Sequence, residues 1–261
     1  RAIQDPEHEL HAELRTTTSL CTSLVQINNT LPPMDDPNVR AAFALALDRE
    51  KLLDQFSEGT DLLAETILPP AMPGYSTDMS ATAFDPQAAK AALIASKYGQ
   101  DLPPVTFLDE GYAGEESDYI NAMISMWEEN LGIQVDLELL DPEDFTRAAR
   151  ETDGHLVPYG WCADYPDPEN FLDILFHSES QFNVAGYENP ELDDLLERAR
   201  TEIDPANRVA LYKQAEALLL GDHAAIPLVH WIDYELAKSY VKGYVSASMG
   251  TRVLHLVYLE R

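Results

Sequence analysis

A short acidic and aromatic segment contains the residue types best able to do chemistry. Three carboxylates, Asp164, Asp167 and Glu169, lie close together and could form an acid–base pair. Asp167 directly precedes a proline, however, and is better explained as a cap at the start of a helix. Asp164, between Trp161 and Tyr165, has no such structural role, so it is either a solvated loop residue or a ligand-binding carboxylate.

Cys162 lies in the same segment and offers a second kind of chemistry. As a thiolate it could act as a nucleophile, with His155 or His177 as its base. Pairing with Cys21, the other cysteine of the chain, would remove that option. Two cysteines are too few for a disulfide scaffold, and their spacing is not that of a metal site.

Other catalytic motifs are absent from the sequence. It contains no glycine-rich phosphate loop followed by lysine and no Gly-x-Ser-x-Gly nucleophile elbow. The seven histidines include no His-Glu-x-x-His pair, and the closest two, His8 and His11, lie in a charged N-terminal segment. We therefore expect no enzyme activity, no metal and no cofactor.

The elements that must position this segment begin with a repeated helix signal. An Asp or Asn stands before a Pro, where its oxygen can accept from amides of the first turn and Pro loses no hydrogen bond. Apolar residues recur at helical spacing after most of these pairs, and a further helix is expected at about residues 115–131. The pairs are Asp36-Pro37, Asp85-Pro86, Asp141-Pro142, Asp167-Pro168, Asn189-Pro190 and Asp204-Pro205.

Strand patterns lie between the predicted helices. Apolar and polar residues alternate over 133–139, as in a half-buried strand. Shorter candidates cover 105–108, 155–159 and 226–232, and a β-prone run covers 20–27. The alternation of helices and strands through the middle of the chain predicts an α/β domain.

The charge balance limits the possible partners. The 261 residues contain 17 Lys and Arg against 46 Asp and Glu, a net charge of −29. Such a surface repels nucleic acid and anionic lipid, and it attracts cationic groups such as free amino termini. The acidity could equally serve solubility alone. No nucleic-acid partner is expected, and no apolar run approaches the ~18–20 residues that span a bilayer.

Several motifs follow one another in a fixed order along the chain. They are Leu20-Cys21-Thr22, Ile27-Asn28-Asn29, Pro32-Pro33, residues 36–49, Leu68-Pro69-Pro70, Pro73-Gly74-Tyr75, residues 127–132, residues 160–165 and residues 204–216. This series resembles the family 5 extracellular solute-binding proteins of ABC importers, and most of all the oligopeptide-binding members. The resemblance covers about Leu20 to Arg261.

The resemblance implies a fold and a division of the chain. The expected fold class is α/β, the C-terminal lobe of a type II (cluster C) periplasmic binding protein, with a mixed sheet flanked by helices. Residues 20–228 would form this ligand-binding lobe. Residues 1–19 would belong to the N-terminal lobe, and residues 229–261 would return to it.

The resemblance also implies roles for particular residues. The matching cysteines of the oligopeptide-binding members form a disulfide, which implies a Cys21–Cys162 bond and an oxidising compartment. The carboxylate at the position of Asp164 grips the α-amino group of the ligand. The backbone around Trp161 and Cys162 resembles the strand edge to which a peptide main chain adds. Trp161 and Tyr165 would be walls of side-chain pockets, or alternatively core residues.

One position departs from the pattern. The oligopeptide-binding members have an Arg three residues before the Trp, usable for the ligand's C-terminus, and this chain has Pro158 there. Arg147 and Arg150 lie upstream and could substitute. A preference for ligand length therefore does not carry over.

The expected function is binding of a solute, most of all an oligopeptide, for an ABC importer. The partners would be the solute and the importer's membrane subunits, and the protein would be a monomer. The expected location is extracytoplasmic, in the periplasm or lipid-anchored at the outer face of the cell membrane. The alternatives are a sensor module that uses a solute-binding lobe, or a binder of another solute such as a nickel chelate or a sugar.

Overall fold

Helices and strands alternate through most of the chain. The computed structural model describes residues 2–99, 101–111, 114–151, 154–250 and 254–260. Its strands are β1 (Leu14–Ile27), β2 (Asp61–Leu63), β3 (Val105–Asp109), β4 (Val135–Leu139), β5 (Leu156–Cys162), β6 (Ala225–Leu236), β7 (Val241–Lys242) and β8 (Tyr258–Leu259). Its α-helices are α1 (Pro37–Leu45), α2 (Arg49–Leu52), α3 (Pro86–Ala95), α4 (Asp118–Leu131), α5 (Pro142–Glu151), α6 (Glu169–Phe176), α7 (Pro190–Thr201) and α8 (Pro205–Gly221). Short helical turns cover Ala2–Gln4, His11–Glu13, Leu53–Ser57 and Leu254–Leu256.

The Asp-Pro and Asn-Pro pairs begin helices as predicted. The side chains of Asp36, Asp85, Asn189 and Asp204 each accept a hydrogen bond from an amide of the first turn, and Pro occupies the first helical positions. The pair at Asp167 differs slightly. Helix α6 begins one residue later, at Glu169, with Pro168 at the cap position, and the Asp167 carboxylate accepts from the Glu169 amide.

Six strands form one mixed sheet in the order β2-β6-β1-β5-β3-β4. Strand β1 pairs antiparallel with both β5 and β6, and β2 pairs antiparallel with β6. Strand β3 pairs parallel with β4 and β5. The sheet is therefore mixed, as expected.

Each face of the sheet carries its own apolar core, because side chains alternate along a strand. On β1, Val25 and Ile27 join a core built with α1, α3 and α4. Leu20 and Leu24, on the opposite face, join a second core built with α6, α7 and α8. Strand β5 follows the same alternation, with Leu156 in the first core and Tyr159 and Trp161 packed against the second.

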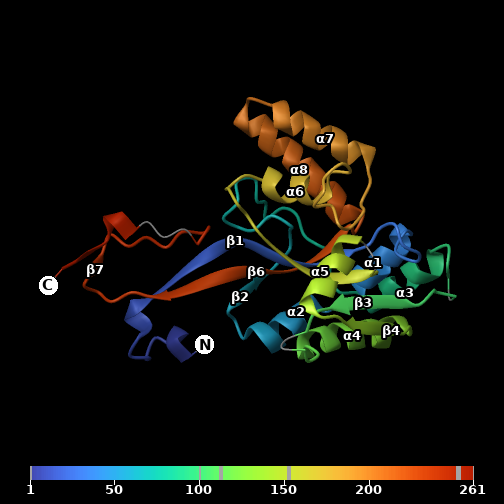
Figure 1. The fold of residues 1–261 in the computed structure, drawn as a ribbon, viewed down its shortest axis with the longest axis horizontal. Helices are drawn as coiled ribbons and strands as arrows, with labels where there is room; N and C mark the ends of the chain where they lie inside the picture. Colours follow the sequence, from blue (N-terminus) through green and yellow to red (C-terminus); the bar gives the residue numbers. More distant parts are fainter. Residues whose placement is uncertain (1, 100, 112–113, 152–153, 251–253, 261) are drawn as a thin grey trace.

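Strands β1 and β6 extend beyond the helix-covered sheet as a two-stranded ribbon (Figure 1). The ribbon pairs Leu14 with Leu236 at its far end and Gln26 with Ala225 inside the lobe. The N-terminal turns and the small β7–β8 sheet lie at the far end of this ribbon, away from the helices (Figure 1). Beyond the ribbon, residues 240–259 expose several large apolar side chains, namely Tyr240, Val245, Leu254, Leu256, Tyr258 and Leu259.

No helix in the described part of the chain is long and apolar enough to cross a membrane.

Candidate ligand-binding site

A disulfide joins the two strands at the centre of the candidate site. Cys21 on β1 and Cys162 on β5 lie directly opposite each other, with their Cα atoms 4.1 Å apart, and their sulfurs are bonded. The pairing implied by the resemblance is therefore present. It leaves no free thiol, so Cys162 cannot serve as a nucleophile.

The two candidate bases also lie apart from Cys162. The ring of His155 contacts the Thr106 amide and the Pro32 carbonyl, before the start of β5. His177 is buried at the end of α6, with its Nε2 3.9 Å from the Asp193 carboxylate. Neither contact places a base at the sulfur, so no nucleophile–base pair forms here.

Strand β5 has one paired edge and one edge that is largely open. It pairs with β1 along its whole length, but with β3 only at Leu156. In the residues that the structure describes, positions 158–162 thus have no strand on the side away from β1. We call this side the open edge of β5.

The register decides which backbone groups point to the open edge. The Ala163 amide donates to the Leu20 carbonyl and the Asn28 amide donates to the His155 carbonyl, so odd-numbered residues of β5 turn their backbone toward β1. Because antiparallel pairs alternate, the even-numbered residues turn the other way. Gly160 and Cys162 therefore present both N–H and C=O to the open edge, and Pro158 presents a carbonyl only.

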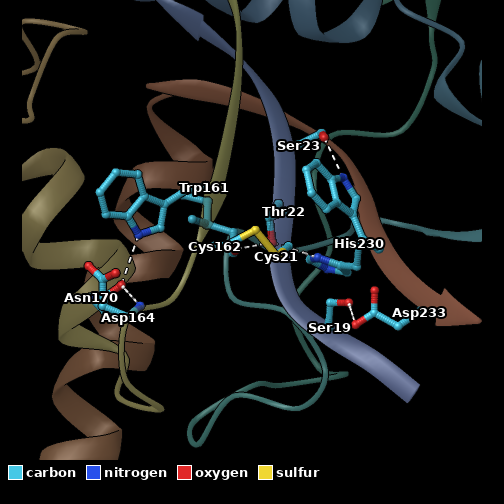
Figure 2. Close-up of a disulfide and its surroundings, with 12 residues drawn as sticks. Ser19, Cys21, Thr22, Ser23, Trp161, Cys162, Asp164, Asn170, His230 and Asp233 are labelled. Atoms are coloured by element: carbon cyan, nitrogen blue, oxygen red, sulfur yellow. Dashed lines mark hydrogen bonds between the residues drawn. A yellow bond between two sulfur atoms is a disulfide. The ribbon is translucent and has the colours of Figure 1, made fainter. Parts of the chain in front are cut away.

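Asn170 fixes the loop that follows β5. Its side chain is fully buried, and its Oδ1 accepts from the indole Nε1 of Trp161 and from the backbone amide of Asp164, each at 3.1 Å. Figure 2 shows both groups directed at this one oxygen, beside the disulfide. One amide oxygen thus sets the orientation of the Trp161 ring and the position of Asp164.

An ion pair anchors the far end of the same loop. The Arg208 guanidinium of α8 makes two hydrogen bonds to the Asp167 carboxylate, at 2.6 and 2.9 Å, and stacks over the Tyr212 ring. Burial raises the pKa of Asp167, but the Arg208 hydrogen bonds, the Glu169 amide and the charge of Arg208 together outweigh it and hold the pKa below its ordinary value. The loop is therefore held at both ends, by Asn170 and by Arg208.

Asp164 and Tyr165 lie on the exposed part of this loop. The Asp164 side chain is exposed, and its carboxylate makes no hydrogen bond or ion pair with the described residues. Tyr165 is 38% exposed, and its hydroxyl donates to Glu169 at 2.9 Å. Asp164 is thus available to a ligand, next to the open edge of β5.

A cavity of about 540 Å³ lies beside Trp161. Val157, Tyr159 and Trp161 of β5 contribute to its lining, with Phe145 of α5 and Phe182 and Val184 of the loop after α6. The rings of Tyr159 and Trp161 are stacked, with centroids 6.3 Å apart, and Phe182 packs edge-on against Trp161 at 5.8 Å. We call this the aromatic pocket.

The buried side chain of Thr22, which follows Cys21 on β1, makes two polar contacts next to the disulfide. The Thr22 hydroxyl donates to the Ile67 carbonyl at 3.0 Å and lies 2.9 Å from His230 Nδ1 (Figure 2). Since its single proton is used, Nδ1 must be the donor to Thr22. Burial lowers the pKa of His230 to about 4, so the ring is neutral at pH 7.

The structure brings the predicted site residues together around the end of β5. Trp161, Cys162, Asp164 and Tyr165 lie on β5 and the loop after it. Arg147 is exposed and pairs with Asp144 on its own helix, whereas the side chain of Arg150 lies outside the described residues.

Asn170, Phe145 and Phe182 were not predicted from the sequence. Asn170 carried one available signal, since it stands in the first turn of a predicted helix, where a polar side chain can reach back to the preceding loop. Phe145 and Phe182 carried none, because only the tertiary packing of α5 and the loop after α6 brings them to the same cavity as Trp161.

Comparison with known proteins gives matches along most of the chain. The sequence model described as "Bacterial extracellular solute-binding proteins, family 5 Middle" matches residues 2–183. The periplasmic oligopeptide-binding protein OppA of Salmonella typhimurium is 30% identical over 253 residues, which cover 93% of this chain and 45% of that protein. The probable deoxycholate-binding periplasmic protein YgiS of Escherichia coli is 33% identical, over 91% of this chain and 45% of that protein.

Solved structures agree with this fold. Haemophilus influenzae OppA in complex with the peptide RPPGFSPFR superposes with a TM-score of 0.80 at 25% identity, over 96% of this chain and 50% of that one. The chain thus spans about half the length of the relatives that it matches.

Proposed function

This chain belongs to the bacterial extracellular solute-binding proteins of family 5, and we propose that it is the peptide-binding lobe of a non-catalytic receptor. The receptor binds a short peptide with a free amino terminus and delivers it to an importer.

The observation that carries this proposal is the placement of Asp164 beside the open edge of β5. A peptide that adds to this edge can exchange main-chain hydrogen bonds with Gly160 and Cys162, whatever its side chains are. Such pairing binds peptides without reading their sequence. Asp164, with its carboxylate exposed, lies just beyond the last residue of the edge.

Asp164 is the group that we assign to the ligand's α-ammonium. A charge-assisted hydrogen bond between an ammonium and a carboxylate contributes roughly 1.5–3 kcal/mol. Acetylation removes the ammonium charge and therefore this contribution. Trp161 and Tyr165 flank Asp164, and we assign them to the walls around the ligand.

We further propose that the chain works as one lobe of a two-lobe protein. It spans about half the length of its relatives, and the apolar side chains exposed on residues 240–259 suit packing against another part of a protein. In this division residues 20–228 are the ligand-binding lobe, and residues 1–19 and 229–261 belong with the second lobe. Closure of the two lobes would trap the peptide and exclude water.

The partners follow from the same proposal. We assign the membrane subunits of an ABC importer as the protein partner and a monomer as the working state. The location is extracytoplasmic, in the periplasm or tethered by a lipid to the outer face of the cell membrane. The Cys21–Cys162 disulfide suits an oxidising compartment of this kind.

A thermal-shift panel on the two-lobe protein tests the function. The panel holds tripeptides to pentapeptides, the same peptides N-acetylated, sodium deoxycholate, a few oligosaccharides and a nickel chelate. Free peptides should raise the Tm, and their acetylated forms should not. A response to deoxycholate, a sugar or the chelate without one to any peptide would replace this function with binding of that solute. No response at all would favour a sensor role for the lobe.

A further inference from the structure

The Cys21–Cys162 disulfide forms the last rung of the ladder between β1 and β5. Because odd-numbered residues of β5 turn their backbone toward β1, this pair exchanges no backbone hydrogen bonds and is joined by its sulfurs. Ala163, the next residue, begins the loop that carries Asp164. The disulfide therefore lies where the open edge of β5 meets the carboxylate assigned to the ligand's ammonium.

The two cysteines differ in how a ligand can reach them. Cys162 is exposed and borders the open edge of β5, whereas Cys21 is only partly exposed and belongs to β1, an inner strand of the sheet. Figure 2 shows the disulfide crossing from Cys162 to Cys21 on β1, with Trp161 and Asp164 on the other side of Cys162. A thiol that arrives along the open edge thus meets the sulfur of Cys162 first, with that of Cys21 behind it.

A peptide bound as proposed brings its first side chain to this sulfur. With its ammonium at Asp164, a peptide on the open edge runs antiparallel to β5, and its first residue lies opposite Cys162. Side chains directly opposite each other in an antiparallel pair point to the same face, with Cβ atoms about 4.5–5.5 Å apart. The first ligand residue, Cys162 and Cys21 then lie side by side on three adjacent strands. A thiol on that first residue approaches Cys162 from the side opposite Cys21, which suits an exchange in which Cys21 is the leaving group.

We propose that the sulfur of Cys162 is a covalent capture site for peptides whose first residue is cysteine. The inference rests on the proposed function and adds a chemical class of ligand to it. The peptide thiolate attacks the Cys162 sulfur, and a peptide–Cys162 disulfide forms as the Cys21–Cys162 bond breaks. The electron pair of the broken bond goes to Cys21, which takes up the proton that the peptide thiol lost. The number of disulfides is conserved, so the exchange needs no oxidant or reductant.

Binding is what gives a thiol access to this reaction. The net charge of −29 repels a free thiolate in solution. A peptide held through its ammonium by Asp164 overcomes this repulsion, and its thiol is then presented to Cys162 at a high effective concentration. Cys21 stays directly opposite Cys162, so it can attack the mixed disulfide in turn and release the peptide unchanged. The capture is therefore reversible.

Intact-mass measurement of the two-lobe protein tests the capture. The protein is mixed with Cys-Ala-Ala, and the exchange is stopped with excess N-ethylmaleimide. The adduct should carry one peptide, mapped by fragmentation to Cys162, and one maleimide group on the freed Cys21. Ala-Cys-Ala has the same composition but points its thiol to the other face, and N-acetyl-Cys-Ala-Ala lacks the ammonium. Both should form the adduct about tenfold or more slowly than Cys-Ala-Ala.

Two serine variants form a matched pair, because each leaves one of the two thiols. The disulfide-linked dimer of Cys-Ala-Ala should transfer a peptide to Cys162 in the Cys21→Ser variant, and this adduct should persist because Cys21 no longer reverses it. The Cys162→Ser variant should react about tenfold or more slowly, since its thiol lies behind β5. Titration with Ser-Ala-Ala, which has no thiol, shows whether each variant still folds and binds. If either variant fails to fold, the peptide panel on the parent protein decides the question.

The results separate the two proposals. If Ser-Ala-Ala and Cys-Ala-Ala bind but no adduct of Cys-Ala-Ala forms, the capture site is overturned and the peptide function stands. The same holds if Ala-Cys-Ala or the acetylated peptide forms the adduct as fast as Cys-Ala-Ala, because the disulfide then reacts with any thiol. If no free tripeptide binds, the function fails and the capture site fails with it.

Discussion

The indole N–H of Trp161 donates to the side-chain oxygen of Asn170, nine residues further along the chain. The same oxygen accepts the backbone amide of Asp164. Asn170 thus couples the wall of the aromatic pocket to the carboxylate assigned to the ligand's amine, and it does so from a fully buried position.

Replacement of Asn170 by Leu should therefore disturb two binding groups at once. The change leaves the Trp161 and Asp164 donors without their acceptor, so we expect a loss of about 1–3 kcal/mol in the free energy of unfolding. Peptide affinity should fall as well, and the advantage of free over acetylated peptides should shrink. Urea unfolding and titration calorimetry measure the two effects. Asn207→Leu, at an exposed position on α8, is the matched control, and an equal loss there would argue against this role.

Replacement of Asp164 by Asn should weaken peptide binding without weakening the fold. The carboxylate is exposed and makes no bond with the described residues, so stability should stay within about 0.5 kcal/mol. Affinity for free peptides should fall roughly 10- to 100-fold, since an ammonium–carboxylate bond contributes about 1.5–3 kcal/mol. Acetylated peptides should bind the variant and the parent equally. Asp54→Asn, also exposed, controls for the loss of one charge, and an equal drop there would point to the general acidic field.

Removal of the disulfide should lower stability strongly. The bond closes a loop with a sequence separation of 141 residues, for which the chain-entropy model gives ~4–5 kcal/mol. The double variant Cys21→Ser, Cys162→Ser should lose stability of this order in urea unfolding. Dithiothreitol should destabilise the parent and leave the double variant unaffected. A parent protein indifferent to reductant, with the bond shown to be reduced, would contradict this expectation.

Glu216 should make the protein less stable as the pH rises, which is the opposite of the usual effect of a carboxylate. Its side chain is fully buried and accepts from the Leu68 amide, and burial raises its pKa from 4.5 to about 7. The folded state then binds more protons than the unfolded state between about pH 4.5 and 7. This stabilising contribution is present below pH 4.5 and is lost as the pH rises through 7.

His230 opposes Glu216 over nearly the same range. Burial lowers its pKa from 6.5 to about 4, so its contribution is present above pH 6.5 and is lost as the pH falls through 4. Glu216→Gln should therefore gain stability relative to the parent between pH 4.5 and 7.5, by up to about 3 kcal/mol. As the pH rises from 4 to 6.5, the free energy of unfolding of His230→Gln should fall relative to that of the parent. Urea unfolding at pH 4.5, 6 and 7.5 measures both, and parallel curves for Glu216→Gln and the parent would refute the assignment.

Much of the fold could be predicted from the sequence, because its signals are local. The Asp-Pro pairs place helix starts through capping chemistry that needs no tertiary partner. The alternation at residues 133–139 marked β4, although the strand begins at Val135. The family was also predicted correctly, since several motifs stand in order along the chain.

The candidate site was predictable only in part. Trp161, Asp164 and the Cys21–Cys162 pair stood out by residue type and by resemblance. The aromatic pocket did not, because Phe145 and Phe182 join Trp161 in lining one cavity only after α5 and the loop after α6 have packed. The backbone groups that face the open edge could not be predicted either, because they depend on the register between β1 and β5.

The ribbon of β1 and β6 brings the two ends of the lobe close together, as in a domain that is inserted into another protein. Leu14 and Leu236 are paired neighbours, so everything between them leaves and rejoins the rest of a chain at nearly one point. Inserted modules are tolerated best where their two ends lie close together. Residues 14–236 could therefore be inserted into the tight turn of an unrelated hairpin through these two strands. The host chain would then be interrupted at a single place.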